Sequence, residues 1–235
     1  MSAPTGKLNR GLPRAAIGAD GWCLQARRYD SPNFDARPAG AIVDLLVIHA
    51  ISLPAGRFGG PHIADLFTNR VDFAFDASFA QLRNVTVSAH FLVRRDGGVL
   101  QFVSCNARAW HAGVSRFGGR DHCNDFSVGI ELEGSDHVAF SPAQYQSLAA
   151  LSVALASRYP LVALAGHEHI APGRKTDPGP LFSWETLAES ILQAAAEPAE
   201  PAALPPASGA RLALAHRLVG ALLTLINVNA RTLKK

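Results

Sequence analysis

The sequence predicts an α/β or α+β domain in which helices flank a mixed central β-sheet. Strand patterns alternate along the chain with helical patterns, and this interleaving is typical of that fold class. The chain has 235 residues, of which 48% are hydrophobic, so it is long enough to bury a core of ordinary size. We expect the domain to span residues 21–196, followed by a Pro/Ala-rich linker over 197–209 and a basic amphipathic helix over 210–235.

The first strand patterns lie in the first half of the chain. Residues 45–48 form a short apolar run that ends at His49, which is the pattern of a buried strand with a polar residue at its end. Residues 87–93 and 99–103 flank an Asp-Gly pair, which is a strong signal for a β-hairpin. Residues 127–133 alternate between apolar and other residues, as a half-buried strand does.

Helices are predicted from their end signals and their periodicity. The run Ser141-Pro142-Ala143-Gln144 provides an N-cap, a proline at the first helical position and a capping-box glutamine, and apolar residues follow at helical spacing. This helix should pack on the sheet. Residues 183–195 form a second amphipathic pattern, and a shorter helix is expected around residues 63–69 within long loops. Long loops in a compact domain often frame a functional site.

The segment 166–180 places imidazole, carboxylate and ammonium groups among three glycines and three prolines. This composition precludes a continuous helix or a central strand, so a loop presents these polar side chains. A catalytic zinc ion takes three His or carboxylate ligands and keeps a fourth position open. His49 at one strand end, together with His167 and Asp177 from this segment, would supply such a set at one sheet edge. The alternative is that each histidine only satisfies a local hydrogen bond.

Two acids on the strand at 127–133 are candidates for a general base. Glu131 and Glu133 are two residues apart and therefore share one face of the strand. A carboxylate that lies near a metal-bound water without binding the metal can take the proton of that water. The residues themselves do not decide between the two acids, and both also fit the plainer interpretation of solvated sheet acids.

Several motifs together resemble a known family. In order along residues 21–184, the chain resembles the zinc-dependent N-acetylmuramoyl-L-alanine amidases, in particular their cytoplasmic AmpD branch. The resemblance covers about 70% of the chain. It is carried by the loop at 166–180 and by Val47-Ile48-His49, Val87-Ser88-Ala89-His90, the run from Arg108 to Gly113 and the run from Cys123 to Gly134.

The resemblance implies a fold shared with peptidoglycan-recognition proteins, with zinc at one edge of a substrate groove. It implies hydrolysis of the amide between the lactyl group of an anhydro-muramic acid and the L-alanine of its stem peptide, so the partner is a small muropeptide. By position, Glu131 rather than Glu133 matches the catalytic base, and Lys175 matches the residue that stabilises the transition state. The matching zinc ligands are His49, His167 and Asp177.

Substrate contacts are expected from Trp110, His111 and Arg174. The resemblance leaves His111 off the metal, and ordinary core burial is the alternative for Trp110. The chain departs from the AmpD pattern at Thr86 and His122, where the branch carries arginines that grip stem-peptide carboxylates. Neither replacement can form a bidentate guanidinium contact, so the preferred stem peptide is open. Compensation would have to come from Arg83, Arg116 or Arg120.

Charge argues against a nucleic-acid partner. The chain has a net charge of +3, but after Glu200 it carries five basic residues and no acid, so residues 1–200 are net negative. The C-terminal helix is too short to cross a bilayer; it would lie on a membrane surface, dock on a partner protein or fold back on its own domain.

Other features bear on the compartment and on a rival function. The first 21 residues contain no signal-peptide core, which favours the cytoplasm over export to the cell wall. The three cysteines are odd in number and widely spaced, and we expect them to be reduced. The rival function is a non-catalytic receptor for peptidoglycan fragments on the same fold, but binding-only relatives lose metal ligands and this chain keeps all three.

Overall fold

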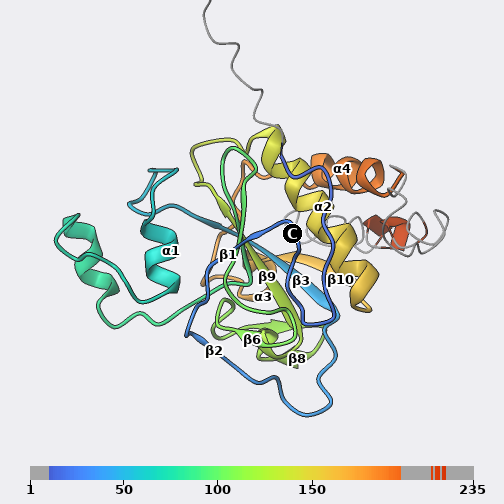
Figure 1. Cartoon of the computed structure of the whole chain (residues 1–235), viewed down its shortest axis with the longest axis horizontal. Helices are drawn as coiled ribbons and strands as arrows, with labels where there is room; N and C mark the ends of the chain where they lie inside the picture. Colours follow the sequence, from blue (N-terminus) through green and yellow to red (C-terminus); the bar gives the residue numbers. More distant parts are fainter. Residues whose placement is uncertain (1–10, 197–212, 214, 218, 221–235) are drawn as a thin grey trace, which may run out of the picture.

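The computed structural model describes residues 11–196, 213, 215–217 and 219–220. Six strands form its central sheet (Figure 1): β1 Arg27–Arg28, β3 Leu45–Ile51, β4 Phe91–Val93, β5 Val99–Gln101, β9 Ser127–Glu133 and β10 Ala163–Gly166. Their order is β1-β5-β4-β9-β3-β10. The β4–β5 hairpin is antiparallel and the other pairs are parallel, which confirms the mixed sheet that the sequence predicts.

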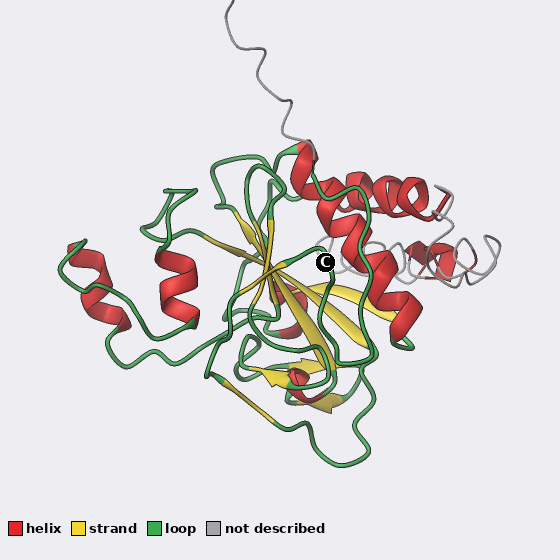
Figure 2. Ribbon diagram, viewed as in Figure 1, coloured by secondary structure: helices red, strands yellow, loops and turns green. Residues whose placement is uncertain are grey.

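One face of the sheet is covered by two helices. Helix α2 (Pro142–Arg158) and helix α4 (Trp184–Ala196) lie together on the same side of the strands (Figure 2). Every second residue of β3 and β9 points toward them, and apolar burial of this kind is the main favourable term in folding. The shared core cluster includes Leu46, Ile48, Val128, Ile130, Leu132, Leu148, Leu151, Leu187 and Ile191.

The start of α2 confirms the predicted capping box. The hydroxyl of Ser141 accepts from the backbone N–H of Gln144, and the Gln144 side chain accepts from the backbone N–H of Ser141. The side-chain amide of Gln144 also donates to the carbonyl of Glu133 at 2.9 Å. This bond ties the beginning of the helix to the end of β9.

The opposite face carries smaller elements. Helix α1 (His62–Phe67) and a 3-10 helix, η1 (Ala77–Leu82), form an arm on that side of the molecule (Figure 1). Phe67 packs there with Leu92 of β4 in a second core cluster. Two short antiparallel pairs and one 3-10 turn complete this face: β2 (Phe34–Asp35) with β6 (Arg108–Ala109), β7 (Arg116–Phe117) with β8 (Arg120–Asp121), and η2 (Cys123–Asp125).

The hairpin is shorter than the sequence predicts. Residues 87–90 lie outside β4, and residues 102–103 lie outside β5. At the start of the predicted hairpin, the backbone N–H of Ser88 donates to the carbonyl of Trp110 rather than to the central sheet. All three cysteines are free and buried, as expected. The described part of the chain contains no helix with both the length and the apolar character needed to cross a membrane.

The expected linker at 197–209 lies outside the described residues, as does most of the segment 210–235. Of that segment, residues 213, 215–217 and 219–220 are helical. Ala215 and Val219 are buried in the same cluster as α2 and α4. These positions agree with the alternative that the helix folds back on its own domain, and docking on a membrane or partner stays a prediction.

Candidate active site

The pairing of β3 with β9 brings His49 beside Glu131. The two strands are parallel, and His49 and Glu131 are direct partners in their register. Side chains alternate along each strand, so both residues point to the face opposite α2. The sheet thus places an imidazole and a carboxylate side by side on the face opposite α2 and α4.

The pairing of β10 with β3 brings in His167. Gly166 is the register partner of Ile48, so the next residue, His167, lies next to His49. At this point the chain turns into a one-turn helix, α3 (His167–Ile170), which ends ahead of Pro172. The loop then returns, and the backbone N–H of Glu168 donates to the carbonyl of Asp177 at 2.9 Å. The loop therefore holds Asp177 against the start of α3.

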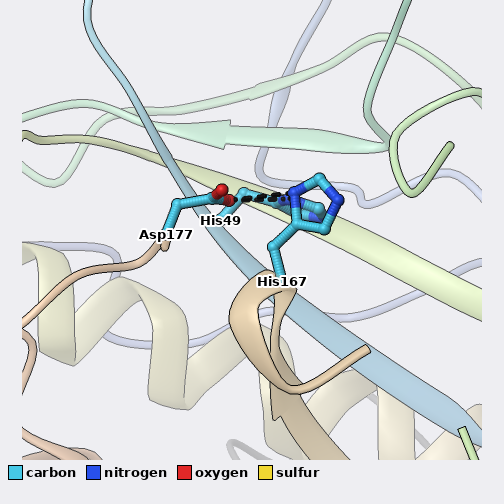
Figure 3. A group of neighbouring side chains, drawn as sticks. All are labelled: His49, His167 and Asp177. Carbon is cyan, nitrogen blue, oxygen red and sulfur yellow. Dashed lines mark hydrogen bonds and ion pairs between the residues drawn. The ribbon is translucent and has the colours of Figure 1, made fainter. Parts of the chain in front are cut away.

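His49, His167 and Asp177 converge on one point (Figure 3). Nδ1 of His49 lies 3.0 Å from Nδ1 of His167 and 3.1 Å from Oδ2 of Asp177. Nδ1 of His167 lies 3.1 Å from the same carboxylate oxygen. The ligand atoms of a tetrahedral zinc ion are about 3.3 Å apart, given bond lengths of about 2.05 Å. The three predicted ligands are thus brought together with a spacing that suits a metal ion.

The outer nitrogen of His167 supports the same assignment. Its Nε2 lies 3.1 Å from the carbonyl oxygen of Ala112, and a carbonyl can only accept. The proton of a neutral His167 is therefore on Nε2, and the lone pair of Nδ1 faces His49 and Asp177. Two imidazole nitrogens and a carboxylate oxygen are a donor set that divalent transition metals bind in proteins.

The pKa shifts of His49 and Asp177 favour the protonation states in which these two residues bind a metal. Burial lowers the pKa of His49, which favours the neutral imidazole. Burial alone would raise the pKa of Asp177, but its contacts with His167 and His49 outweigh this effect and bring that pKa well below its ordinary value. Neutral histidines and an ionised carboxylate are the forms that ligate a metal.

Glu131 has the properties of a general base. Its side chain lines the pocket in front of the three ligands, and its Oε2 is buried without a hydrogen-bond partner in the described part of the chain. Burial raises the pKa of Glu131 well above its usual range, and the charge of Asp177 adds to this while the ammonium of Lys175 opposes it. A raised pKa suits a carboxylate that accepts a proton near neutral pH.

Glu133, the other candidate, has a structural environment. Its Oε1 accepts from the backbone N–H of Gly59 and its Oε2 from that of Arg95, both at 3.0 Å. These bonds join the loop after β3 to the β4–β5 turn. With both oxygens engaged and the side chain buried, Glu133 is not positioned to exchange protons with a substrate.

Replacing Glu133 with glutamine should destabilise the fold without affecting chemistry. The amide group of glutamine cannot accept from both backbone N–H groups, so one buried donor loses its partner, which costs about 1–3 kcal/mol. Urea unfolding of the metal-free protein measures this loss. Turnover and metal affinity of the folded variant should match those of the wild type; a fall in turnover at unchanged stability would contradict this assignment.

The pocket in front of the site has a volume of about 250 Å³. Trp110, His111 and Lys175 all line it, so three of the residues expected at the substrate or transition state face this space. The sequence predicts no apolar wall for this pocket, although the long loops expected around residues 63–69 indicate that this region frames a site. That wall consists of Ala50, Ile51, Phe67, Val85 and Val87.

Arg174 is placed differently from these residues. It does not line the pocket; its Nη2 donates to the carbonyls of Ala112 and Val114 at 2.8 and 2.6 Å. These bonds join the 166–180 loop to the loop after β6, so the structure gives Arg174 a bridging contact. A contact of Arg174 with substrate stays a prediction.

The arginines considered as replacements for the missing pair also have partners on the protein. Arg120 pairs with Asp44 at 2.9 Å, and Arg116 lies 3.7 Å from Asp121. The guanidinium of Arg83 lies over the ring of Phe73. None of the three lines the pocket, so compensation for the missing arginines stays a prediction.

Comparison with known proteins identifies the class to which this fold and site belong. The family model for N-acetylmuramoyl-L-alanine amidase matches residues 39–180. The chain therefore belongs to the N-acetylmuramoyl-L-alanine amidase family, and it is an amidase.

Individual relatives agree with this class. The chain is 54% identical to the 1,6-anhydro-N-acetylmuramyl-L-alanine amidase AmpD of Citrobacter freundii over 167 residues, which are 70% of this chain and 89% of AmpD. It is 54% identical to AmpD of Escherichia coli K12 over 166 residues, 70% of this chain and 91% of that protein. A crystal structure of a selenomethionine AmpD derivative superimposes with a TM-score of 0.73 and 51% identity, covering 74% of this chain and 99% of that one.

Proposed function

We propose that this amidase is a zinc enzyme that hydrolyses the amide between the lactyl group of 1,6-anhydro-N-acetylmuramic acid and the L-alanine of a peptidoglycan stem peptide. The observation that carries the proposal is the convergence of two imidazole nitrogens and one carboxylate oxygen, 3.0–3.1 Å apart, beside a buried glutamate. The substrate follows from the similarity to AmpD proteins, which are named for this activity. The proposed place of action is the cytoplasm, in the recycling of cell-wall fragments.

The metal would be held by Nδ1 of His49, Nδ1 of His167 and Oδ2 of Asp177. A zinc ion in such a site polarises a carbonyl and lowers the pKa of a bound water to about 7. The donor set fits zinc, since three protein ligands of these types with an open fourth position are usual for catalytic zinc. The rest of the chemistry depends on the protein side chains around it.

Glu131 would carry the proton. Its free carboxylate oxygen accepts the proton of the attacking water and later donates it to the nitrogen of the leaving L-alanine. Burial raises the pKa of this carboxyl group, which favours the protonated form that the second transfer needs. General acid–base transfer of this kind contributes about 10²- to 10⁴-fold in rate.

Lys175 and Trp110 would act on other parts of the substrate. The Lys175 side chain lines the same pocket as Glu131, so its ammonium can face the oxygen of the scissile carbonyl as negative charge develops there. A preorganised donor in that position is worth about 3–4 kcal/mol. Trp110 and the apolar wall offer a surface for the carbons of the sugar and the lactyl group.

The test is a product analysis. Zinc-loaded protein is incubated with an anhydro-muramyl tripeptide, and the products are identified by mass spectrometry. We expect anhydro-muramic acid and a peptide with a free L-alanine amine, with no product from protein treated with a chelator and full recovery when zinc is returned. Binding of the intact muropeptide without release of either product would show instead a fragment receptor.

A further inference from the structure

Apart from Trp110, the two sequence motifs at residues 108–113 and 123–127 have no role in the proposed function, yet they lie directly behind the metal site. His111 of the first motif and Ser127 of the second are buried. Each metal-site histidine has one ring nitrogen facing Asp177 and another facing these motifs. The first motif therefore contacts both histidines on the side away from Asp177.

A chain of hydrogen bonds runs from His49 into the second motif. Nε2 of His49 lies 2.9 Å from Nδ1 of His111, and Nε2 of His111 lies 3.2 Å from Oγ of Ser127. The Ser127 hydroxyl donates to the carbonyl of Cys123 at 2.6 Å. This series of hydrogen bonds thus ends on the Cys123 carbonyl, which can only accept a hydrogen bond.

This end point determines the direction of every bond. The single hydroxyl proton of Ser127 goes to the carbonyl, so its oxygen accepts from Nε2–H of His111. A neutral His111 then has its lone pair on Nδ1 and accepts from Nε2–H of His49. The lone pair of His49 is left on Nδ1, which faces His167 and Asp177.

The same motifs support the other histidine. The side-chain oxygen of Asn124 accepts from the backbone N–H groups of His111 and Ala112, at 3.2 and 2.8 Å. It thereby holds the backbone segment whose carbonyl, that of Ala112, accepts from Nε2 of His167. Two neighbouring residues on one loop therefore orient both histidines.

The sheet leaves room for this arrangement at Gly129. A Cβ on Gly129 would overlap the ring of His111, so the imidazole lies flat against β9 only because no side chain is present. The backbone of Gly129 exchanges hydrogen bonds with His90, which keeps the strand in place beneath the ring. The position of His111 is thus set from two sides.

We propose that His111 is a positioning residue for the metal, anchored by Ser127, and that it acts through His49 rather than by contacting the substrate. The inference rests on the proposed function, since the tautomer of His49 matters only if its Nδ1 binds a metal. Outer hydrogen-bond partners of metal-bound histidines typically contribute 10- to 100-fold in metal affinity. Replacing His111 or Ser127 should therefore weaken zinc binding more than it weakens substrate binding.

The test compares zinc dissociation constants, measured by competition with a chelating dye, for His111→Asn and His111→Leu in the full chain. Asparagine carries an oxygen close to the position of Nδ1 and keeps an acceptor for His49, whereas leucine removes it. We expect zinc affinity to fall 10- to 100-fold in His111→Leu and to stay nearer the wild type in His111→Asn. Ser127→Ala should fall between them, and the visible absorption of the cobalt-loaded leucine variant should change.

Two further variants make the test specific. Gly129→Ala keeps every hydrogen-bonding group but displaces the His111 ring, and it should weaken zinc binding in the same direction. His62→Asn is the matched control, because His62, the first residue of α1, packs against the ring of Phe75 and forms no hydrogen bond to a metal-site residue in the described part of the chain. Circular dichroism of the metal-free variants checks that each one folds. If His111→Leu does not fold, His111→Asn, Ser127→Ala and Gly129→Ala still test the inference.

The alternative outcomes separate this inference from the proposed function. Wild-type zinc affinity in His111→Leu, with a raised KM for the anhydro-muropeptide, would mean that His111 contacts substrate and would overturn the inference alone. A wild-type protein that neither binds zinc nor releases L-alanine would overturn the proposed function and the inference with it.

Discussion

Replacing Glu131 with glutamine is expected to reduce turnover of an anhydro-muropeptide by about 10²- to 10⁴-fold while zinc binding is retained. Glutamine has nearly the same size, but its amide cannot accept a proton from water or return it to the leaving amine. Glu131 is not one of the three converging ligands, so its loss leaves their geometry in place. Glu131→Ala should behave in the same way.

The measurement combines single-turnover kinetics with a zinc dissociation constant for the same preparation. Glu133→Gln is the matched control, since it makes the same chemical change two residues along the same strand at a carboxylate that only holds backbone N–H groups. If Glu131→Gln kept near-normal turnover, or if Glu133→Gln lost it, the assignment of the base would be wrong.

The strongest sequence patterns predicted the fold well because they depend on local physics. The capping box at Ser141 needs only residues that are close in the chain, and it occurs in the structure as predicted. The strand at 127–133 shows the predicted alternation, with its apolar face on α2, but it is buried on both faces and not half-buried as predicted. The first hairpin strand was predicted too long, because the hydrogen-bond partner of Ser88 is a distant backbone group that periodicity does not reveal.

The choice between Glu131 and Glu133 shows what the local pattern leaves open. The two acids are equivalent in alternation, and only the resemblance to a family separated them. In the structure they differ through long-range register: Glu131 is the partner of His49, whereas Glu133 meets the N–H groups of Gly59 and Arg95. Strand register across a parallel sheet depends on the whole fold, so it is not contained in the seven residues of the strand.

Residues around the ligands were harder still to predict. Ser127 and Asn124 lie within the motif from Cys123 to Gly134, but the sequence predicts no role for them. Their partners are a ring nitrogen and backbone groups of the segment at 111–112, which are distant in the chain. For Arg174 the substrate contact stays a prediction, but the sequence does not reveal that its guanidinium donates to two carbonyls of another loop. Such contacts need three-dimensional coordinates.

The second large effect is expected for Asp177→Asn, which should lose zinc and turnover together. Asparagine preserves the shape of the side chain but removes the charge that Oδ2 brings to within 3.1 Å of both histidine nitrogens. The metal supplies several kcal/mol of transition-state stabilisation, and each 1.36 kcal/mol is tenfold in rate, so turnover should fall by about 10³-fold or more. His167→Ala should show the same double loss.

Thermal unfolding with and without zinc distinguishes this variant from Glu131→Gln. A ligand at 100 times its dissociation constant stabilises the folded state by about 2.7 kcal/mol, which for a domain of this size corresponds to a rise in Tm of about 5–10 °C. The wild type and Glu131→Gln should both show that rise, and Asp177→Asn should not. A zinc-dependent rise of full size in Asp177→Asn would remove Asp177 from the ligand set and place the metal elsewhere in the pocket.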